Sequence, residues 1–200
     1  MNIAIVDYGV GNLRSVQKSL ERVAHQSKVN IVNDKESILN ADKLVLPGVG
    51  AIQAAKQKLE ELDLINPLKD FASSGKSFLG ICVGFQLLFD KSFEGGEIEG
   101  LGLIEGEVRK FSKGKVPHMG WNQINIKNEC PLFDGIKSLA NLYFCHSYYA
   151  IPKDENVIAT STNYNIDFTS SVWQNNIFGT QFHPEKSQLV GLKILENFIK

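Results

Sequence analysis

The first half of the chain alternates short apolar runs with segments of helical periodicity. Four apolar runs predict buried strands, at residues 2–8, 28–32, 43–47 and 77–81. After the first run, Leu13, Val16, Leu20 and Val23 recur at helical spacing, and Asn12 stands where a helix cap is expected.

Further helices are predicted between the later strands. The pattern places a short helix after Asp34, one over 51–62, one that begins at Asn66-Pro67 and stops at Gly75, and one over 84–91. The 51–62 helix carries Ala55, Leu59 and Leu62 on one stripe. Repeated strand–helix–strand units of this kind build a parallel sheet covered by helices.

The second half is dominated by strand-like segments with short polar breaks. They span residues 102–111, 122–126, 142–151, 156–162, 168–174 and 176–182. The Asn175-Asn176 break predicts a tight hairpin, and 187–199 a closing helix with Leu189, Leu192, Leu195 and Phe198-Ile199. We therefore predict one α/β domain over residues 1–200: a mostly parallel sheet flanked by helices with added antiparallel strands.

Composition narrows the class of protein. With 21 basic and 22 acidic residues and no charged block, nucleic acid and membrane surfaces are poor candidate partners. Three cysteines do not suggest a disulfide framework, and no Cys/His spacing suggests a metal site. The start of the chain is predicted to be a strand rather than a signal peptide. We expect a cytoplasmic enzyme that uses no cofactor.

A single cysteine stands where the strand at 77–81 gives way to a helix. Cys82 has a glycine two residues to either side, Gly80 and Gly84. This is the layout of a nucleophile elbow, in which a strained turn lifts the nucleophile above the sheet and only small flanking residues fit. The helix start beyond it favours a thiolate. The alternative is a buried structural cysteine, but this setting makes catalysis the better interpretation.

A thiol nucleophile needs a base and a group that orients the base. His183 ends the strand 176–182, and Pro184 favours an extended backbone there. Residues 183 and 185 then project to one side, so the Glu185 carboxylate can meet the imidazole. The alternative, that Glu185 caps the following helix, stays open.

The other histidines are weaker candidates. His25 is predicted to be solvated surface, and His118 to pack or bond locally in a loop. His146 follows Cys145 directly, but adjacent residues of a strand point to opposite faces, so these two cannot form a pair. Cys145 is therefore predicted to lie in the core.

Several motifs together carry a resemblance to a known family. "GICVGFQ" (80–86) and "HPEKS" (183–187) are similar to the class I (triad) glutamine amidotransferases, whose sheet is flavodoxin-like. "DYGVGNLRSV" (7–16), "LPGVG" (46–50) and "KVPHMGWN" (115–122) resemble one branch, the glutaminase subunits of imidazole glycerol phosphate synthase in histidine biosynthesis. The resemblance covers almost the whole chain.

The resemblance implies an activity, hydrolysis of L-glutamine through a cysteinyl thioester. It implies the catalytic triad Cys82, His183 and Glu185. Oxyanion donors would be the backbone N–H of Val83 and the strand end at Val49 and Gly50. Glutamine would be held by a set of residues at the pocket: Gln86, Glu94, His146, Ser147 and Tyr148. Of these, Glu94 rests only on its spacing from Cys82, and an exposed loop carboxylate is an equally good interpretation.

The resemblance also implies a partner, because the ammonia is used by a separate barrel-shaped cyclase subunit in a heterodimer. Interface candidates are Val10, Asn12, Trp121, Asn122 and Lys186; Trp121 in the core and Lys186 as plain surface charge are the alternatives. Asn165-Ile166 and Phe85 depart from the usual family residues. They leave open a paralogue that feeds a synthase for surface sugars. A catalytically silent regulatory subunit and a cysteine peptidase are less favoured.

Overall fold

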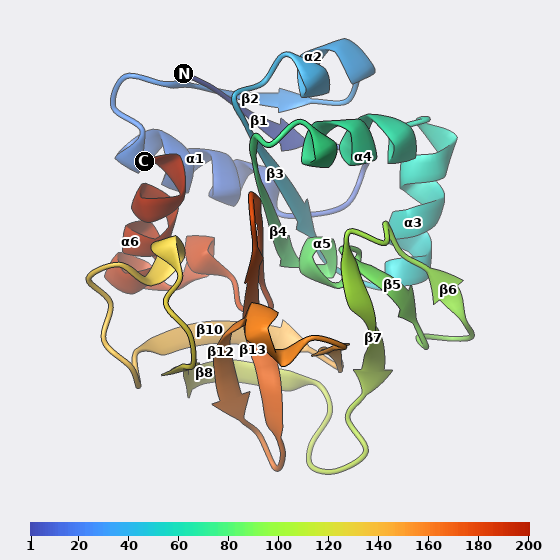
Figure 1. Ribbon diagram of the computed structural model, residues 1–200, viewed down its shortest axis with the longest axis vertical. Coiled ribbons are helices and arrows are strands. Elements are labelled where there is room, and N and C mark those ends of the chain that lie inside the picture. Colours follow the sequence, from blue (N-terminus) through green and yellow to red (C-terminus); the bar gives the residue numbers. More distant parts are fainter.

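A computed structural model describes residues 1–200 and shows a sheet with helices on both faces (Figure 1). Its centre is parallel, with β2 (Lys28–Val32), β1 (Asn2–Val6), β3 (Lys43–Gly48), β4 (Ser77–Cys82) and β14 (Ile177–Thr180) side by side in that order. The alternating pattern of the first half predicted four of these strands, and β1, β3 and β4 are almost wholly buried, whereas the edge strand β2 buries only Val29.

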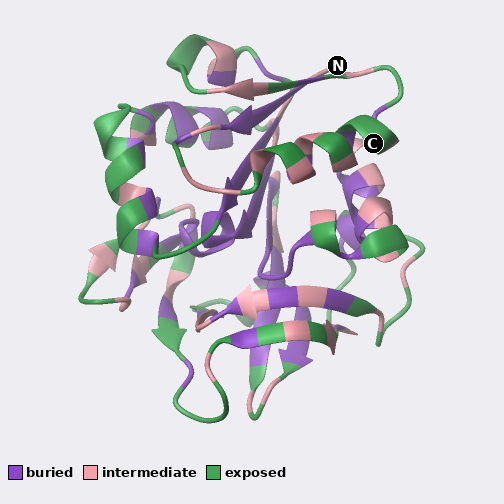
Figure 2. Cartoon of the chain, turned by 180° about the vertical axis from the view of Figure 1, so that it is seen from behind, coloured by how far each residue is buried: buried purple, intermediate pink, exposed green.

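Helices cover this sheet on two sides. Figure 1 shows α1 (Leu13–Val23) and α6 (Gln188–Ile199) on one side, and α3 (Ile52–Glu61) and α4 (Ile65–Ser73) on the other, with α2 (Lys35–Leu39) beside α4. The strands between them are buried, whereas the outer helix faces are exposed (Figure 2). A single cluster of 51 buried hydrophobic residues runs through the molecule.

Antiparallel strands extend the sheet beyond β14. The order continues β13 (Asp167–Gln174), β11 (Tyr148–Pro152), β7 (Ile104–Lys110), β5 (Phe89–Ser92) and β6 (Ile98–Glu99). Off this path, β12 (Ile158–Asn163) pairs with β13, and β9 (Asn125–Ile126) pairs with β12. Within this part only β5 and β7 run parallel. The predicted fold class, a mostly parallel sheet with helices and antiparallel additions, is confirmed.

A separate two-stranded ribbon crosses the lower part of Figure 1. It pairs β8 (His118–Gln123) with β10 (Asn141–His146) in antiparallel register. Three single-turn 3₁₀ helices complete the chain: η1 (Pro131–Phe133), η2 (Glu155–Val157) and η3 (Pro184–Lys186).

The predicted helix over 84–91 is wrong beyond its first turn. Only α5 (Val83–Gln86) is helical, and Phe89 begins strand β5, which pairs with β7. The run of apolar residues there fits a buried helix or a buried strand equally, and tertiary pairing decided for the strand.

Two predicted strands are each divided in the structure. The segment 142–151 breaks at Ser147 into β10 and β11, which belong to different sheets, and 122–126 is shared between β8 and β9. A strand-like pattern in the sequence does not reveal where a strand bends away from one sheet and joins another. The chain turns because β10 leaves the main sheet to pair with β8.

Helix ends account for the remaining errors. Helix α4 begins at Ile65 with Leu64 as its cap residue, so Asn66-Pro67 lies inside the first turn rather than before it. Proline is tolerated there because the first N–H groups of a helix have no partner. Leu62 follows the end of α3 and is 43% exposed. Asn12 occupies the cap position of α1 but makes no side-chain capping bond.

Other local predictions are confirmed. Strand β2 has the predicted bounds, Gly75 follows the end of α4 with a φ of +80°, and Asn175-Asn176 joins β13 to β14 as a two-residue hairpin loop. No helix is both long and apolar enough to cross a membrane.

Candidate active site

The candidate site lies where three neighbouring strands reach the same edge of the sheet. Gly48 at the end of β3 pairs with Cys82 at the end of β4, and Thr180 at the end of β14 pairs with Ile81. Because these strands are parallel, their carboxyl ends meet, and this is where open α/β sheets bind ligands. His183 follows β14 by three residues, so chain segments a hundred residues apart converge.

Cys82 sits on a strained turn between β4 and α5. Its backbone has φ +55° and ψ −106°, a conformation that a non-glycine residue rarely adopts. The flanking glycines make the turn possible: a Cβ on Gly80 would lie 2.7 Å from the Gly84 carbonyl oxygen, and one on Gly84 would overlap the Leu46 carbonyl. This is the geometry of the predicted nucleophile elbow.

His183 and Glu185 meet as their spacing predicted. The His183 Nδ1 atom lies 2.9 Å from Glu185 Oε1, and both side chains are nearly inaccessible to solvent, at 3% and 2% exposure. The carboxylate therefore faces the imidazole and does not cap α6, which resolves the alternative for Glu185. Its second oxygen, Oε2, is buried without a hydrogen bond.

Two opposed effects set the pKa of His183. Burial, the largest, favours the neutral ring, but hydrogen bonding and charge from Cys82 and Glu185 outweigh burial and raise the pKa to about 10. At neutral pH the imidazole is therefore protonated. A protonated imidazole beside the sulfur stabilises a thiolate and carries a proton ready for a leaving group.

The Cys82 sulfur is held by two further groups. The thiol is 3.8 Å from the Cys145 carbonyl oxygen, and Gln181 Nε2 donates to the sulfur, also at 3.8 Å. His183 lines the same pocket as the sulfur, and its raised pKa reflects Cys82 as well as Glu185. The bond to the Cys145 carbonyl belongs to the protonated thiol, whereas a thiolate keeps only the bond that Gln181 donates.

The backbone of His183 is fixed on strand β10. Its N–H donates to the Tyr143 carbonyl at 2.9 Å, while Ser187 Oγ accepts from the Tyr143 N–H at 3.0 Å and donates to the His183 carbonyl at 2.6 Å. The ribbon β8–β10 thus helps to position the base. No local pattern indicated these roles for Tyr143 or Ser187, although Ser187 belongs to the "HPEKS" motif.

A pocket of about 130 Å³ opens over the sulfur. It contains every residue predicted for the triad except Glu185, every predicted oxyanion residue and every predicted glutamine contact. Its twelve lining residues are Val49, Gly50, Cys82, Val83, Gln86, Glu94, Cys145, His146, Ser147, Tyr148, His183 and Lys186. The prediction that Cys145 lies in the core is wrong: it is half-buried and lines this pocket, because β10 ends here rather than continuing through the core.

Glu94 and His146 reach the pocket in ways the sequence did not reveal. Glu94 is half-buried, and its Oε2 accepts from the Ile52 N–H at the start of α3, at 2.8 Å. His146 is buried, and both of its ring nitrogens are engaged within the protein, with His118 and with the Tyr148 carbonyl. The His146 ring therefore offers no free nitrogen to a ligand, although the residue lines the pocket.

The loop after β3 is anchored at both ends. Before it, the buried Tyr8 hydroxyl donates to the Pro47 carbonyl at 2.6 Å, and after it Glu94 holds Ile52. Burial, reinforced by the nearby Cys82, raises the pKa of Tyr8, which stays a neutral donor. Gly50, with φ +83°, lets the loop turn between the anchors. Nothing in the sequence indicated this role for Tyr8, which was predicted to lie in the first strand but stands two residues beyond the end of β1.

The interface candidates differ in how far their side chains are exposed. Trp121 is 48% exposed on β8, which rules out its placement in the core, and Met119 beside it is 61% exposed. Asn122 is half-buried, and its amide is already bonded to His118 and to the Asn163 carbonyl. Of the remaining candidates, Val10 is half-buried and Asn12 is exposed, while the exposed Lys186 lines the pocket and lies 5.7 Å above the Tyr143 ring.

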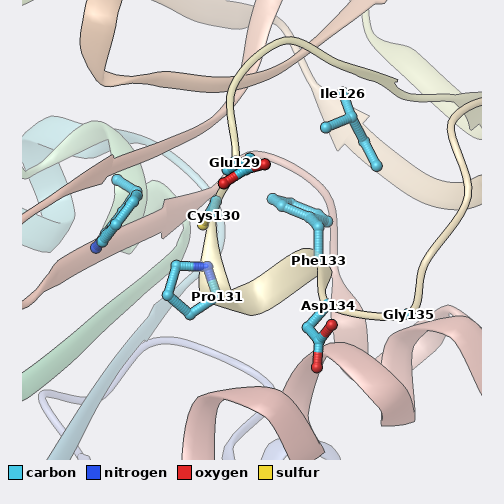
Figure 3. A pocket seen from close by; sticks show the side chains of 8 residues that line it. Ile126, Glu129, Cys130, Pro131, Phe133, Asp134 and Gly135 are labelled. Atoms are coloured by element: carbon cyan, nitrogen blue, oxygen red, sulfur yellow. The ribbon is translucent and has the colours of Figure 1, made fainter.

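A larger hollow of about 560 Å³ lies away from this site, around Cys130 and η1 (Figure 3). The figure shows Glu129 and Asp134 as its acidic groups, and no histidine lines it. Burial raises the pKa of the Cys130 thiol to about 11. A protonated thiol without a base is not a nucleophile, so this hollow does not compete with Cys82. No group of three His, Cys, Asp or Glu is arranged to hold a metal ion.

Known proteins resemble this chain over nearly its full length. The family described as glutamine amidotransferase class-I matches residues 4–200. Relatives from Geobacter metallireducens and Aquifex aeolicus, both named imidazole glycerol phosphate synthase subunit HisH, are 50% identical, covering 98% and 99% of this chain and 96% of each relative. A relative of the same name from Methanosarcina barkeri is 51% identical over 98% of this chain and 97% of its own length.

Solved structures agree on the fold. A glutamine amidotransferase crystal structure superposes with a TM-score of 0.77 at 19% identity, covering 98% of this chain and 99% of that one. The structure of PurLQS from Thermotoga maritima gives a TM-score of 0.76 at 21% identity, with coverage of 99% and 97%. At 19–21% identity, these two structures show that the fold is shared.

Proposed function

The chain belongs to the class I glutamine amidotransferase family, and from that premise we propose that it is the glutaminase subunit of an imidazole glycerol phosphate synthase. It hydrolyses L-glutamine to glutamate and ammonia, and a separate synthase subunit uses the ammonia in histidine biosynthesis. One observation carries the proposal: the strained Cys82 lines the same pocket as the buried His183, whose ring Glu185 orients. The names of relatives at about half identity supply the pathway.

The reaction begins with attack of the Cys82 thiolate on the side-chain carbonyl carbon of glutamine. The carbon–nitrogen bond then breaks, and His183 delivers its proton to the departing nitrogen, which leaves as ammonia. A γ-glutamyl thioester remains on the sulfur. Water loses a proton to His183 and attacks the thioester, which releases glutamate and restores the thiolate beside the imidazolium.

Each tetrahedral intermediate carries an oxyanion that needs preorganised donors. We assign one donor to the Val83 N–H at the start of α5, directly after the nucleophile. The second comes from the Val49–Gly50 loop, which lines the same pocket. Anchoring of this loop by Tyr8 and Glu94 supports the assignment, because a fixed loop need not reorganise during the reaction.

Glutamine is held by the opposite side of the pocket. Gln86 and Tyr148 line it, and we assign the free Glu94 oxygen to the α-amino group of the substrate. Ser147 and the backbone of His146 complete the proposed contact surface. A pocket of about 130 Å³ has the scale of one small amino-acid ligand, and the match to class I glutamine amidotransferases over residues 4–200 argues against a peptidase.

The partner docks, in our proposal, on the face formed by ribbon β8–β10 and the pocket mouth. The exposed Met119 and Trp121 supply apolar anchors of the kind that dominate interfaces. Val10, Asn12 and Lys186 form the rim, and Asn122 contributes by holding β8 rather than by direct contact. We further propose that residues 1–200 act as one cytoplasmic glutaminase domain and that the partner is the barrel-shaped cyclase.

Glutaminase assays with and without the cyclase subunit test this function. Wild-type protein plus cyclase should release ammonia from L-glutamine, and Cys82→Ala should abolish release while retaining the complex. Cleavage of peptides without use of glutamine would favour the peptidase. Binding without any turnover would favour the silent regulatory subunit. Activation only by a surface-sugar synthase would favour the paralogue.

A further inference from the structure

Two buried imidazoles outside the triad face one another across ribbon β8–β10. His118 on β8 and His146 on β10 are register partners, 3% and 6% exposed, with His118 Nδ1 2.9 Å from His146 Nε2. Aromatic rings surround the pair, which are Phe111, Phe144, Tyr164 and Phe168. Imidazoles buried among such rings are costly unless their nitrogens are hydrogen-bonded.

The partners of the pair fix the direction of every bond. The Tyr148 carbonyl can only accept, so His146 Nδ1 donates to it at 2.7 Å, and His146 Nε2 must accept from His118 Nδ1. His118 Nε2 then accepts from the Asn122 side-chain amide at 3.2 Å. Burial lowers the pKa of His118 to about 4 and that of His146 to about 3, so both rings are neutral. Only one assignment satisfies all four groups, with the proton on Nδ1 of both rings.

The chain of bonds continues to the nucleophile. The Tyr148 carbonyl also accepts from Gln86 Nε2 at 3.1 Å, and the same Gln86 nitrogen donates to Gln181 Oε1 at 3.0 Å. Gln181 Nε2 in turn donates to the Cys82 sulfur at 3.8 Å. Because both hydrogens of the Gln86 amide are used, its orientation depends on where the Tyr148 carbonyl points.

We propose that His118 is a positioning residue for the glutaminase, acting through His146 and the Tyr148 carbonyl to orient Gln86 in the glutamine pocket. The inference rests on the proposed function. It gives a role to strand β8, which carries the exposed Met119 and Trp121 on one side and His118 on the other. The alternative is that His118 only fills space between Phe144 and Tyr164, whose rings stack on it at 4.9 Å and 4.0 Å.

Two substitutions separate these roles. In His118→Asn the amide nitrogen replaces Nδ1 as donor to His146, but the ring is lost; in His118→Phe the ring is kept and the donor is lost. Each is assayed with the cyclase at saturation. We expect His118→Phe to lower kcat/KM for glutamine roughly tenfold, mainly by raising KM, and His118→Asn to stay within about threefold of wild type. A purely structural defect lowers the active fraction and leaves KM unchanged. The reverse ranking of the two variants would overturn the proposal.

Nitrogen-15 NMR of the two rings tests the same inference without any variant or substrate. Long-range proton–nitrogen correlations on the wild-type chain at neutral pH should show His118 and His146 both protonated on Nδ1 alone. A proton on Nε2 of either ring, or an imidazolium, would overturn the proposal. Absence of ammonia release by the wild-type complex would instead refute the proposed function and leave the ring assignment standing.

Discussion

Nδ1 of His183 lies 2.9 Å from Oε1 of Glu185, in a place that solvent hardly reaches. The carboxylate therefore fixes which ring nitrogen faces the sulfur, and it stabilises the protonated ring in surroundings where burial alone would favour the neutral form. Glu185→Gln keeps the shape and removes the charge. We expect kcat for glutamine to fall by roughly 10² or more with KM little changed. Steady-state kinetics with saturating cyclase measures this, and an unchanged kcat would contradict the role assigned to Glu185.

The raised pKa of His183 has a consequence for stability. A ring whose pKa is about 10 in the folded protein, against an ordinary 6.5, favours folding by an amount fully present below pH 6.5 and lost as the pH rises through about 10. The free energy of unfolding should therefore decline between pH 7 and pH 10 more steeply in wild type than in His183→Asn. Urea titrations across this range measure the difference, with exposed His25→Gln as the matched control that should follow wild type. Parallel curves for wild type and His183→Asn would rule out the raised pKa.

Gly84 permits the elbow by passing close to Leu46. A methyl group there would overlap the Leu46 carbonyl in the backbone of β3, which cannot give way as a flexible side chain could. We expect Gly84→Ala to cost about 3 kcal/mol or more in the free energy of unfolding, or to prevent folding. Gly75→Ala is the control, since φ is +80° there but the space is open, and it should cost only about 1 kcal/mol. Urea denaturation ranks the two, and equal costs would show that the close approach to β3 is not what selects glycine.

Trp121 tests the proposed docking face. Its side chain is 48% exposed, so Trp121→Ala should leave the stability of the isolated chain nearly unchanged but weaken cyclase binding by about tenfold or more. Leu189→Ala is the control, because Leu189 is 75% exposed on α6 and outside the proposed face. Titration calorimetry of each variant with the cyclase measures the two dissociation constants. Equal affinities for both variants would place the interface elsewhere.

The sequence predicted correctly those features of the fold and the site that depend on residues close together in the chain. The elbow at Cys82 needed only two glycines and a strand end, and the His183–Glu185 contact needed only an extended backbone before Pro184. The parallel half of the fold followed from alternating periodicity. These features depend on residues that are neighbours in the chain.

Other features depend on partners far away in the sequence. The strand at Phe89 exists because β7 lies beside it, and the corner at Ser147 exists because β10 pairs with β8. Cys145 lies at the pocket rather than in the core for the same reason. Likewise, no local pattern shows that Tyr8 anchors Pro47 or that His118 meets His146. Three-dimensional pairing decides such positions, and a single sequence does not display it.

The covalent step at Cys82 is tested most directly by mapping the acyl-enzyme. The wild-type complex is mixed with L-glutamine, quenched in acid during turnover, digested and analysed by mass spectrometry. We expect a γ-glutamyl thioester on the peptide that contains Cys82, and none on the peptides that contain Cys130 or Cys145. Ammonia release without modification of Cys82, or with the adduct on another cysteine, would contradict this expectation.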